Sequence, residues 1–272
     1  MNDNEHERLR ADRLERLYRQ WNRREHVAPD PLQLIYAYED PVEREIAALL
    51  ASCLAYGRVA HIVRSVSHAL ARLPHPARFL ASASDRLLRR AFRGFRHRFT
   101  GGGEIAALLL GARDVRECYG SLGACLAAGL RSSDDTIAPA LSAFVREVTR
   151  RHPTVRRFLL PDPAEGSACK RLNLYLRWMV RRDAVDPGGW DGVPASRLIV
   201  PLDTHMHRIA LALGLTRRRQ ANLRTALEVT AAFRRVAPED PVRYDFALTR
   251  LGMRNPDGAA ADLRGLLLQE AA

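Results

Sequence analysis

The chain has 272 residues, of which 47% are apolar, and a formal net charge of +12 with an isoelectric point of about 10.5. This length and apolar content exclude a disordered chain and are sufficient for one large core or two smaller lobes. The positive charge favours a polyanionic partner such as nucleic acid, although solvated arginines from an arginine-rich proteome would give the same total.

Membrane insertion and secretion are not expected from the sequence. No stretch approaches the roughly 18 uninterrupted apolar residues of a membrane span. The first ten residues, MNDNEHERLR, carry charges where a signal peptide needs an apolar segment. The four cysteines include no C-x-x-C pair, which indicates reduced thiols rather than a disulfide framework or a zinc ribbon. We therefore expect a cytoplasmic protein.

The most informative feature of the composition is its lysine content. Among 43 lysine and arginine residues, only Lys170 is a lysine. Arginine serves phosphate contacts and surface ion pairs, but its guanidinium stays protonated above about pH 12. An amine that loses its proton can attack carbon and form a Schiff base. Lys170 is thus a candidate nucleophile, and the alternative is one lysine that survived by chance in a GC-biased gene.

Apolar residues recur at helical spacing almost throughout the chain, which predicts an all-α fold. Residues 1–25 are expected to form a peripheral charged helix. The segment Asp40–Glu43 resembles a capping box with proline at the first helical position, and it predicts a core helix that ends near Gly57. Several further helices are expected between residues 58 and 157.

Residues 89–99 interleave arginines with aromatic residues, as a surface that follows a nucleic-acid backbone would. The pattern is more typical of a solvated helix with Phe92, Phe95 and Phe99 turned inward. We therefore take the second interpretation as the prediction.

The sequence after residue 158 predicts a turn between two helices. Phe158–Pro161 is expected to end one helix, and the loop 162–169 leads to Lys170 in the first turn of the next. The free backbone N–H groups of such a loop are ligands for phosphate. The helical spacing places Lys170 on an outward face, opposite an apolar stripe, together with the residues Asn173, Arg177 and Arg181.

Asp203 is predicted to open another helix, which Gly214 closes. The structural interpretation of Asp203 is N-capping, worth about 1 kcal/mol. A capping carboxylate is also rigid, charged and exposed, so a catalytic role is compatible with it. The remaining chain predicts a helix over about 217–236, a helix from Asp240 to Gly252 and a short C-terminal helix.

One stretch resembles a known superfamily. Residues 202–210, LDTHMHRIA, followed by Leu213–Leu215, resemble the V-D-T-H-x-x-R…L-G-L segment of helix-hairpin-helix (HhH-GPD) base-excision DNA glycosylases. The lysine that follows the hairpin in that superfamily corresponds to Lys170. Its separation from Asp203 is 33 residues, similar to that in archaeal 8-oxoguanine DNA glycosylases. The chain also resembles a bacterial family of uncharacterised proteins related to these enzymes.

The resemblance implies a two-lobed helical bundle, with residues 26–60 plus 200–272 in the first lobe and 61–199 in the second, which holds a hairpin at about 158–170. It implies that Lys170 attacks the sugar and that Asp203 deprotonates Lys170 or stabilises positive charge on the sugar. The implied DNA contacts are Gly166, Ser167, Arg171, His205 and Arg208. The early helix of the superfamily, here residues 40–58, ends beside the lesion pocket.

The implied function is a bifunctional DNA glycosylase and AP lyase that excises an oxidised purine such as 8-oxoguanine. Its partner would be double-stranded DNA with a damaged base, bound by a monomer. Some members carry an iron–sulfur cluster on cysteines near the C-terminus, but no cysteine follows Cys169, so neither a cofactor nor a metal is expected. The hairpin departs from the usual L-P-G-x-G form, because residues 161–166 read PDPAEG.

Two other functions remain open. The first is a non-catalytic DNA-binding protein that keeps the glycosylase fold. The second is a metal-dependent hydrolase that uses Asp203, His205 and His207, although side chains two positions apart on a helix are rotated by about 200° and cannot share a face. The aromatic residues Tyr56, Trp178 and Trp190 are candidates for stacking on a flipped base, but burial in the core is the more usual role of such residues.

Overall fold

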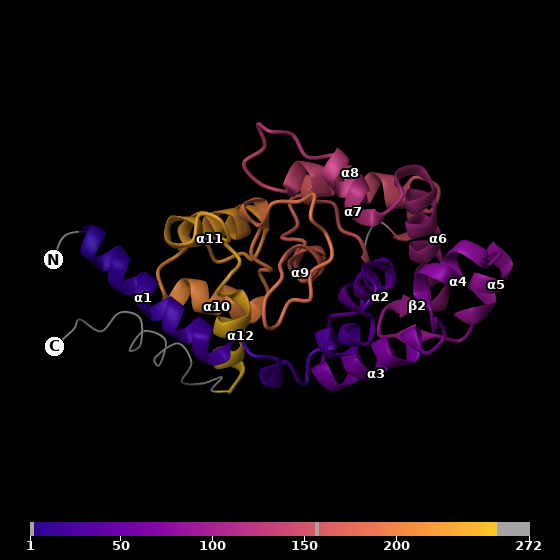
Figure 1. Ribbon diagram of the computed structural model, residues 1–272, viewed down its shortest axis with the longest axis horizontal. Helices are drawn as coiled ribbons and strands as arrows, with labels where there is room; N and C mark the ends of the chain where they lie inside the picture. Colours follow the sequence, from indigo (N-terminus) through magenta and orange to yellow (C-terminus); the bar gives the residue numbers. More distant parts are fainter. Residues whose placement is uncertain (1–2, 156–157, 255–272) are drawn as a thin grey trace.

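The computed structural model describes residues 3–155 and 158–254, and it confirms the predicted all-α fold (Figure 1). Its α-helices are α1 (Asp3–Trp21), α2 (Pro41–Cys53), α3 (Val59–Leu70), α4 (Pro76–Ser82), α5 (Asp85–Ala91), α6 (Gly102–Tyr119), α7 (Leu122–Ala128), α8 (Ala138–Thr149), α9 (Lys170–Val180), α10 (Thr204–Ala212), α11 (Leu223–Val236) and α12 (Asp245–Arg254). The strands β1 (Arg96–His97) and β2 (Thr100–Gly101) form one small antiparallel hairpin. The short C-terminal helix that we predicted lies outside the described residues.

Helices α2 and α9 pack against each other in the middle of the molecule. Helices α1 and α10–α12 gather at one end, and α3–α6 lie at the other (Figure 1). Buried apolar side chains form one continuous cluster that runs from Leu14 to Leu248. Helix α2 also packs against α3, α4 and α6, so the lobe boundary predicted after residue 60 falls between helices that are in contact. The division into two lobes stays a prediction.

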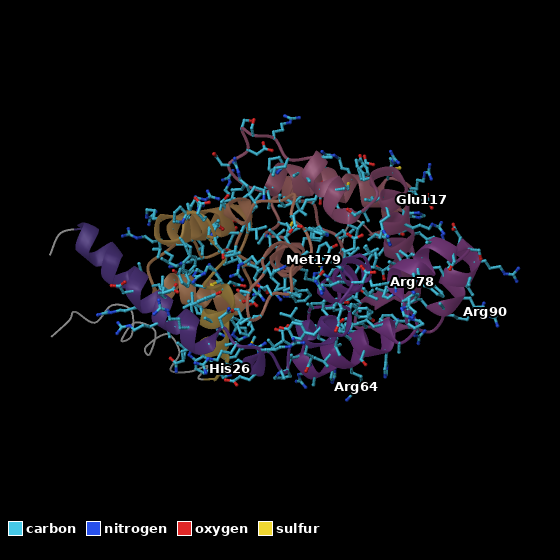
Figure 2. All side chains as sticks on the ribbon, in the orientation of Figure 1. His26, Arg64, Arg78, Arg90, Glu117 and Met179 are labelled. Carbon is cyan, nitrogen blue, oxygen red and sulfur yellow. The ribbon has the colours of Figure 1, made fainter. Side chains whose placement is uncertain are left out.

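The surface is rich in arginine. Arg64, on α3, and Arg90, on α5, lie at the periphery of the molecule (Figure 2), and both side chains are exposed. None of the helices in the described part of the chain is long and apolar enough to cross a membrane.

The start of α2 forms as predicted, but Glu43 has a different role. Asp40 Oδ1 accepts a hydrogen bond from Val42 N at 2.9 Å, and Pro41 is the first helical residue. The Glu43 carboxylate does not complete a capping box. It accepts a hydrogen bond from Ala77 N at 2.7 Å and so satisfies the first turn of α4. Helix α2 ends at Cys53, a few residues before the predicted end near Gly57.

Helix α1 is more deeply buried than a peripheral helix would be. Leu14, Leu17 and Trp21 recur on one face, and all three belong to the buried core. This face packs against α11 and α12. An ion pair between Glu15 and Arg243, at 2.9 Å, joins α1 to the segment before α12. Only the outer face of α1 carries the solvated charges that the sequence suggested.

The polar face of α9 is buried, which corrects the prediction that it faces outward. Asn173, Arg177 and Arg181 are nearly inaccessible to solvent. Arg177 bonds to Asp186 at 3.1 Å and to Asp245 at 2.6 Å. The carboxylates around Arg181 are Asp183, Asp186 and Asp240. This face is therefore covered by acidic residues from the loop after α9 and from the segment around the start of α12.

Three predicted helix ends differ from the structure. Phe158–Pro161 does not end a helix, because α8 already ends at Thr149 and short 3-10 turns follow at Pro153–Val155 and Pro163–Glu165. The helix predicted over 217–236 begins only at Leu223, since Asn222 Oδ1 caps it by accepting from Thr225 N at 3.1 Å. The last described helix begins at Asp245 rather than at Asp240 and extends past Gly252.

Candidate active site

Lys170 is the first residue of α9, as predicted, but its side chain turns inward. Cys169 precedes it in the left-handed conformation, with φ of +47°. The Lys170 Nζ donates to the carbonyl oxygen of Ala55 at 3.5 Å and lies 4.0 Å from Oδ2 of Asp203. The side chains of Lys170 and Asp203 are 29% and 25% exposed. The only lysine therefore faces a carboxylate in a site that solvent still reaches.

The two oxygens of Asp203 have different partners. Oδ1 accepts hydrogen bonds from the backbone N–H groups of His205 and Met206, both at 2.9 Å. This is the N-cap of α10 that the sequence predicted. Oδ2 is turned toward Lys170. Because the cap fixes the orientation of the carboxylate, the oxygen that faces the amine is held in place by the fold itself.

Lys170 and Asp203 line a cavity of about 500 Å³. Volumes of about 300–1,000 Å³ are typical of small-molecule sites. One wall is the segment that follows α2, with Ala55, Tyr56 and Gly57. Helix α2 ends two residues before this wall, at Cys53, and the assignment of the cavity as a lesion pocket stays a prediction. Other lining residues come from distant parts of the chain and were not predicted: Asp30, Pro31, Leu174, Leu202, Ala221 and Met253.

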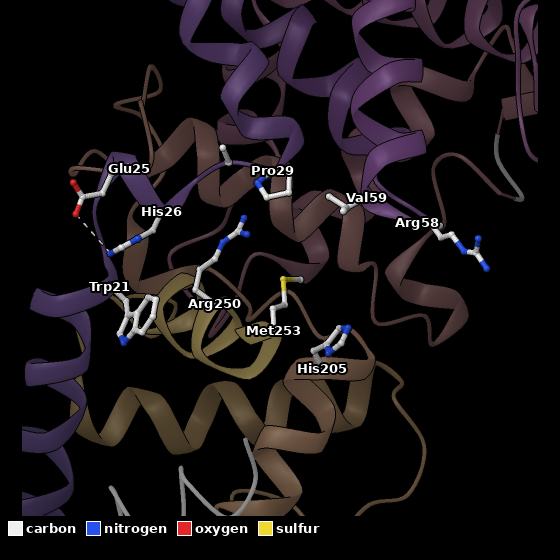
Figure 3. A pocket seen from close by; sticks show the side chains of 11 residues that line it. Trp21, Glu25, His26, Pro29, Arg58, Val59, His205, Arg250 and Met253 are labelled. Carbon is white, nitrogen blue, oxygen red and sulfur yellow. Dashed lines mark ion pairs between the residues drawn. The ribbon is translucent and has the colours of Figure 1, made fainter. Parts of the chain in front are cut away.

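A second cavity has a volume of about 570 Å³, and Figure 3 shows the residues that line it. The two share the lining residues Gly57, Val59, His205 and Met253. The far side of the second cavity contains Trp21, whose ring centroid lies 4.9 Å from that of His26. It also contains Arg250, which the sequence analysis did not single out.

The Arg250 guanidinium is anchored at the edge of this second cavity. It donates to Asp30 Oδ2 at 2.8 Å and to the carbonyl oxygen of Val27 at 2.9 Å. Residues 21–30 and 250–253 are separated by most of the chain, so no local pattern could reveal that they meet. Together the two cavities, which share four lining residues, provide an amine, a carboxylate, aromatic rings and a guanidinium.

The predicted DNA-contacting residues lie in different environments. Gly166 is exposed with φ of +84°, and Ser167 is half-buried, its Oγ accepting from Cys169 N at 3.2 Å. Arg208 is exposed. His205 is half-buried, contacts Arg208 through Nδ1 at 3.3 Å and lines both cavities. The structure thus brings His205 to the Lys170 cavity and leaves Gly166 and Arg208 accessible on the surface.

Arg171 is half-buried, and its guanidinium is engaged by other groups of the protein. Its guanidinium donates to the carbonyl oxygens of Cys53, at 2.8 Å, and of Phe158. It also lies 5.1 Å from the ring centroid of Tyr56 and 4.7 Å from that of Phe158. Burial lowers the pKa of this guanidinium. In this geometry Arg171 connects α9 to the end of α2 instead of offering a free phosphate ligand.

The candidate metal ligands Asp203, His205 and His207 have different surroundings. Asp203 caps α10, whereas His207 is buried and its Nε2 lies 2.8 Å from the carbonyl oxygen of Arg218. Within residues 3–155 and 158–254, no three histidine, cysteine, aspartate or glutamate side chains are grouped so that they could hold a metal ion.

The three aromatic candidates for base stacking also separate. Trp178 and Trp190 are buried in the core, where aromatic residues usually lie. Tyr56 is half-buried and lines the Lys170 cavity. Only Tyr56 of these three is therefore placed where it could meet a ligand in that cavity.

Fold and site together define an all-helical protein in which a lone lysine and a helix-capping aspartate face each other in one cavity, beside a second cavity that shares four of its lining residues. The profile of the family described as "Protein of unknown function (DUF2400)" matches residues 30–254, and the chain belongs to this family. The matched region contains Lys170, Asp203 and the whole lining of the first cavity. No curated protein and no solved structure matches the chain.

Proposed function

We propose that the protein is a DNA glycosylase with AP-lyase activity that excises a damaged base from duplex DNA. The observation that carries the proposal is the position of the only lysine, whose Nζ lies 4.0 Å from Asp203 Oδ2 in a cavity of about 500 Å³. The resemblance of residues 202–215 to the glycosylase segment supports the same conclusion. The net charge of +12 suits a polyanionic substrate.

In the proposed reaction, the neutral amine of Lys170 attacks C1′ of the deoxyribose. The bond from C1′ to the base breaks, and the base leaves with the electron pair and takes up a proton. The nitrogen of the adduct loses a proton and its lone pair then opens the sugar ring, which gives an iminium at C1′ and a protonated O4′. Loss of a proton from C2′ breaks the bond from C3′ to the phosphate oxygen, and water releases Lys170.

Asp203 is suited to assist the first step. A general base acts from about 2.6–3.2 Å, or through one water, and apo sites are often looser than this. The separation of 4.0 Å between Lys170 and Asp203 meets this requirement with a small side-chain movement. The same carboxylate would stabilise positive charge on the sugar, because its Oδ2 faces the cavity while Oδ1 stays bound to the helix.

The adjoining cavity provides space for a flipped base beyond the sugar. The half-buried ring of His26, which packs against the buried Trp21, and the anchored Arg250 offer a stacking surface and hydrogen-bond donors. A purine has the acceptor atoms that such donors recognise. An oxidised purine such as 8-oxoguanine is the proposed lesion, on the similarity to the archaeal enzymes.

Borohydride trapping tests the proposed function. Duplex DNA with 8-oxoguanine or an abasic site is incubated with the protein and reduced, and the covalent adduct is measured by gel and by intact mass. We expect an adduct with the wild type and none with Lys170→Arg. The double variant Lys170→Arg/Arg208→Lys is the matched control, because it restores a lysine on the exposed face of α10, outside the cavity.

The outcome separates the proposal from the non-catalytic alternative. An adduct of equal yield in the double variant would show that any surface amine suffices and would overturn the assignment of Lys170. If the wild type and Lys170→Arg bind duplex DNA equally and neither forms an adduct nor releases a base from a panel of lesions, the protein is a DNA-binding protein without this chemistry.

A further inference from the structure

The hairpin formed by β1 and β2 presents an aromatic ring to solvent at its tip. Phe99 is 71% exposed, more than any other large apolar side chain in the described residues. The two earlier aromatic residues of the segment, Phe92 and Phe95, are buried as predicted. The prediction that all three rings turn inward is wrong for Phe99, because α5 ends at Ala91 and the chain reverses through a turn at residues 98–99.

The hairpin is fixed to the wall of the Lys170 cavity. The Tyr56 hydroxyl donates to the carbonyl oxygen of His97 at 2.7 Å and shares a hydrogen bond with the Thr100 hydroxyl at 2.8 Å. The ring of His97 is buried, and its Nε2 lies 3.1 Å from the carbonyl oxygen of Tyr56. Because Tyr56 itself lines the cavity, these bonds attach both strands of the hairpin to a residue of the cavity wall.

Gly57, which also lines the cavity, leaves space for a side chain of the hairpin. Gly57 has φ of +101°, and a Cβ at this position would lie 2.7 Å from Nη1 of Arg98. Arg98 itself adopts the left-handed region, with φ of +51°, which is costly for a non-glycine residue. Its guanidinium lies 5.4 Å from the ring centroid of Phe99. The missing side chain of Gly57 therefore leaves room for Arg98 beside the cavity wall.

The exposed ring continues a row of aromatic side chains. Tyr56 and Phe158 have centroids 4.9 Å apart, and Phe158 and Phe99 have centroids 6.0 Å apart, both edge to face. Phe99 is thus supported from behind while most of its surface remains open. A supported aromatic ring with a free surface is a stacking platform for a nucleobase.

The surroundings of Phe99 are strongly basic. Arg58, Arg93, Arg96 and Arg98 are exposed, and within the described chain none of them forms an ion pair with a carboxylate. At the base of the hairpin, Arg86, Arg89, Arg90 and Arg93 line an open hollow of about 790 Å³. Positively charged guanidinium groups around a protruding apolar ring match the chemistry of a nucleic acid, in which phosphates flank stacked bases.

We infer that Phe99 enters the base stack of duplex DNA and fills the space left when a nucleotide moves into the Lys170 cavity, while the neighbouring arginines bind the flanking phosphates. The inference rests on the proposed function, since it assumes that a nucleotide leaves the helix. It assigns to this hairpin a role in opening the duplex that is separate from the chemistry at Lys170.

Fluorescence of 2-aminopurine tests this inference without using the chemistry. The background is Lys170→Arg, and the probe is a duplex with a tetrahydrofuran abasic site opposite 2-aminopurine, whose emission rises when it is unstacked. We expect a rise on binding that Phe99→Ala abolishes and Phe99→Trp retains, and Phe99→Ala should weaken binding roughly tenfold. Tyr119→Ala is the matched control, because Tyr119 is a 38% exposed aromatic residue that lines neither cavity.

A second measurement distinguishes failure of the inference from failure of the proposed function. Single-stranded abasic DNA has no stack to open, so the trapped adduct should be equal in the wild type and in Phe99→Ala. If the wild type forms no adduct, the glycosylase proposal fails, and the fluorescence experiment still reports on Phe99. A fluorescence rise in Phe99→Ala equal to that in the parent, or no rise in the parent, would overturn the role of the hairpin.

Discussion

Asp203 caps a helix with Oδ1 and faces Lys170 with Oδ2. Substitutions of Asp203 should therefore change the stability and the activity of the protein to different extents. Asp203→Asn keeps an oxygen that can accept from His205 N and Met206 N, whereas Asp203→Ala removes the cap. Loss of an N-cap costs about 1 kcal/mol of unfolding free energy, and asparagine caps as well as aspartate does. The contact with Lys170, at 4.0 Å and partly exposed, adds at most about 0.5 kcal/mol.

We therefore expect Asp203→Asn to lower the free energy of unfolding by no more than about 0.5 kcal/mol, and Asp203→Ala to lower it by about 1–1.5 kcal/mol. Both variants lose the charged Oδ2, so both should slow base release by about 10²- to 10⁴-fold. Urea unfolding measures the first effect, and single-turnover release of 8-oxoguanine measures the second.

Two results would refute this reasoning. If Asp203→Asn lost as much stability as Asp203→Ala, the contribution of Asp203 to the fold would come from its charge rather than from the cap. If Asp203→Asn released base at the wild-type rate, the carboxylate would have no part in the chemistry. In that case Lys170 would have to act without the partner that the structure places beside it.

Three further predictions concern the buried charges and the hairpin. Arg177→Met leaves Asp245 buried without its guanidinium, while Asp186 keeps Arg181, and it should lower the free energy of unfolding by about 3–5 kcal/mol in urea titrations. Adding Asp245→Asn should restore part of the loss, and an additive second loss would contradict this account. Burial raises the pKa of Asp245 to about 6 despite its contact with Arg177. The folded state therefore binds this proton more tightly than the unfolded state, so its contribution of about 3 kcal/mol is present below about pH 4 and is lost as the pH rises through about 6. That part of the pH dependence of unfolding should be absent in Asp245→Asn. Finally, Tyr56→Phe removes the hydroxyl that bonds to the hairpin, so it should lower the free energy of unfolding by about 1–2 kcal/mol and speed trypsin cleavage at Arg98. An unchanged cleavage rate would show that other contacts hold the hairpin.

The sequence predicted the parts of this protein that depend on short-range signals. Asp40 and Asp203 act as helix caps because a side-chain oxygen at that position satisfies backbone donors two or three residues away. Lys170 begins α9 for a similarly local reason, since a loop ends immediately before it. A side-chain cap places Asp203 at a helix end, whereas Cys169, before Lys170, makes no capping hydrogen bond. The superfamily resemblance supplied the expectation that Lys170 and Asp203 meet.

The polar face of α9 shows where such signals fail. Asn173, Arg177 and Arg181 have the spacing of a solvated face, and a single helix gives no sign of what covers it. Their carboxylate partners follow α9 in a loop or lie near the start of α12. The burial of this face is a tertiary property that depends on pairing charges across long sequence distances.

The second cavity and the hairpin were missed for related reasons. Trp21 and Arg250 come to line one cavity only in the folded chain, and neither segment alone indicates a cavity. The strands Arg96–His97 and Thr100–Gly101 are too short to show an alternating pattern. Nothing in the sequence distinguished Phe99 from the two buried aromatic residues before it.

Because Lys170 is the only lysine, its cavity can also be studied by chemical labelling of that one side chain. A compound that acylates amines has only two possible targets in the chain, the N-terminal amine and Lys170. The side chain of Lys170 is 29% exposed within its cavity, so its acylation rate measures how open that cavity is. Any molecule that enters the cavity should protect Lys170 in proportion to its occupancy, and the intact mass of the chain would record binding without a label or an activity assay.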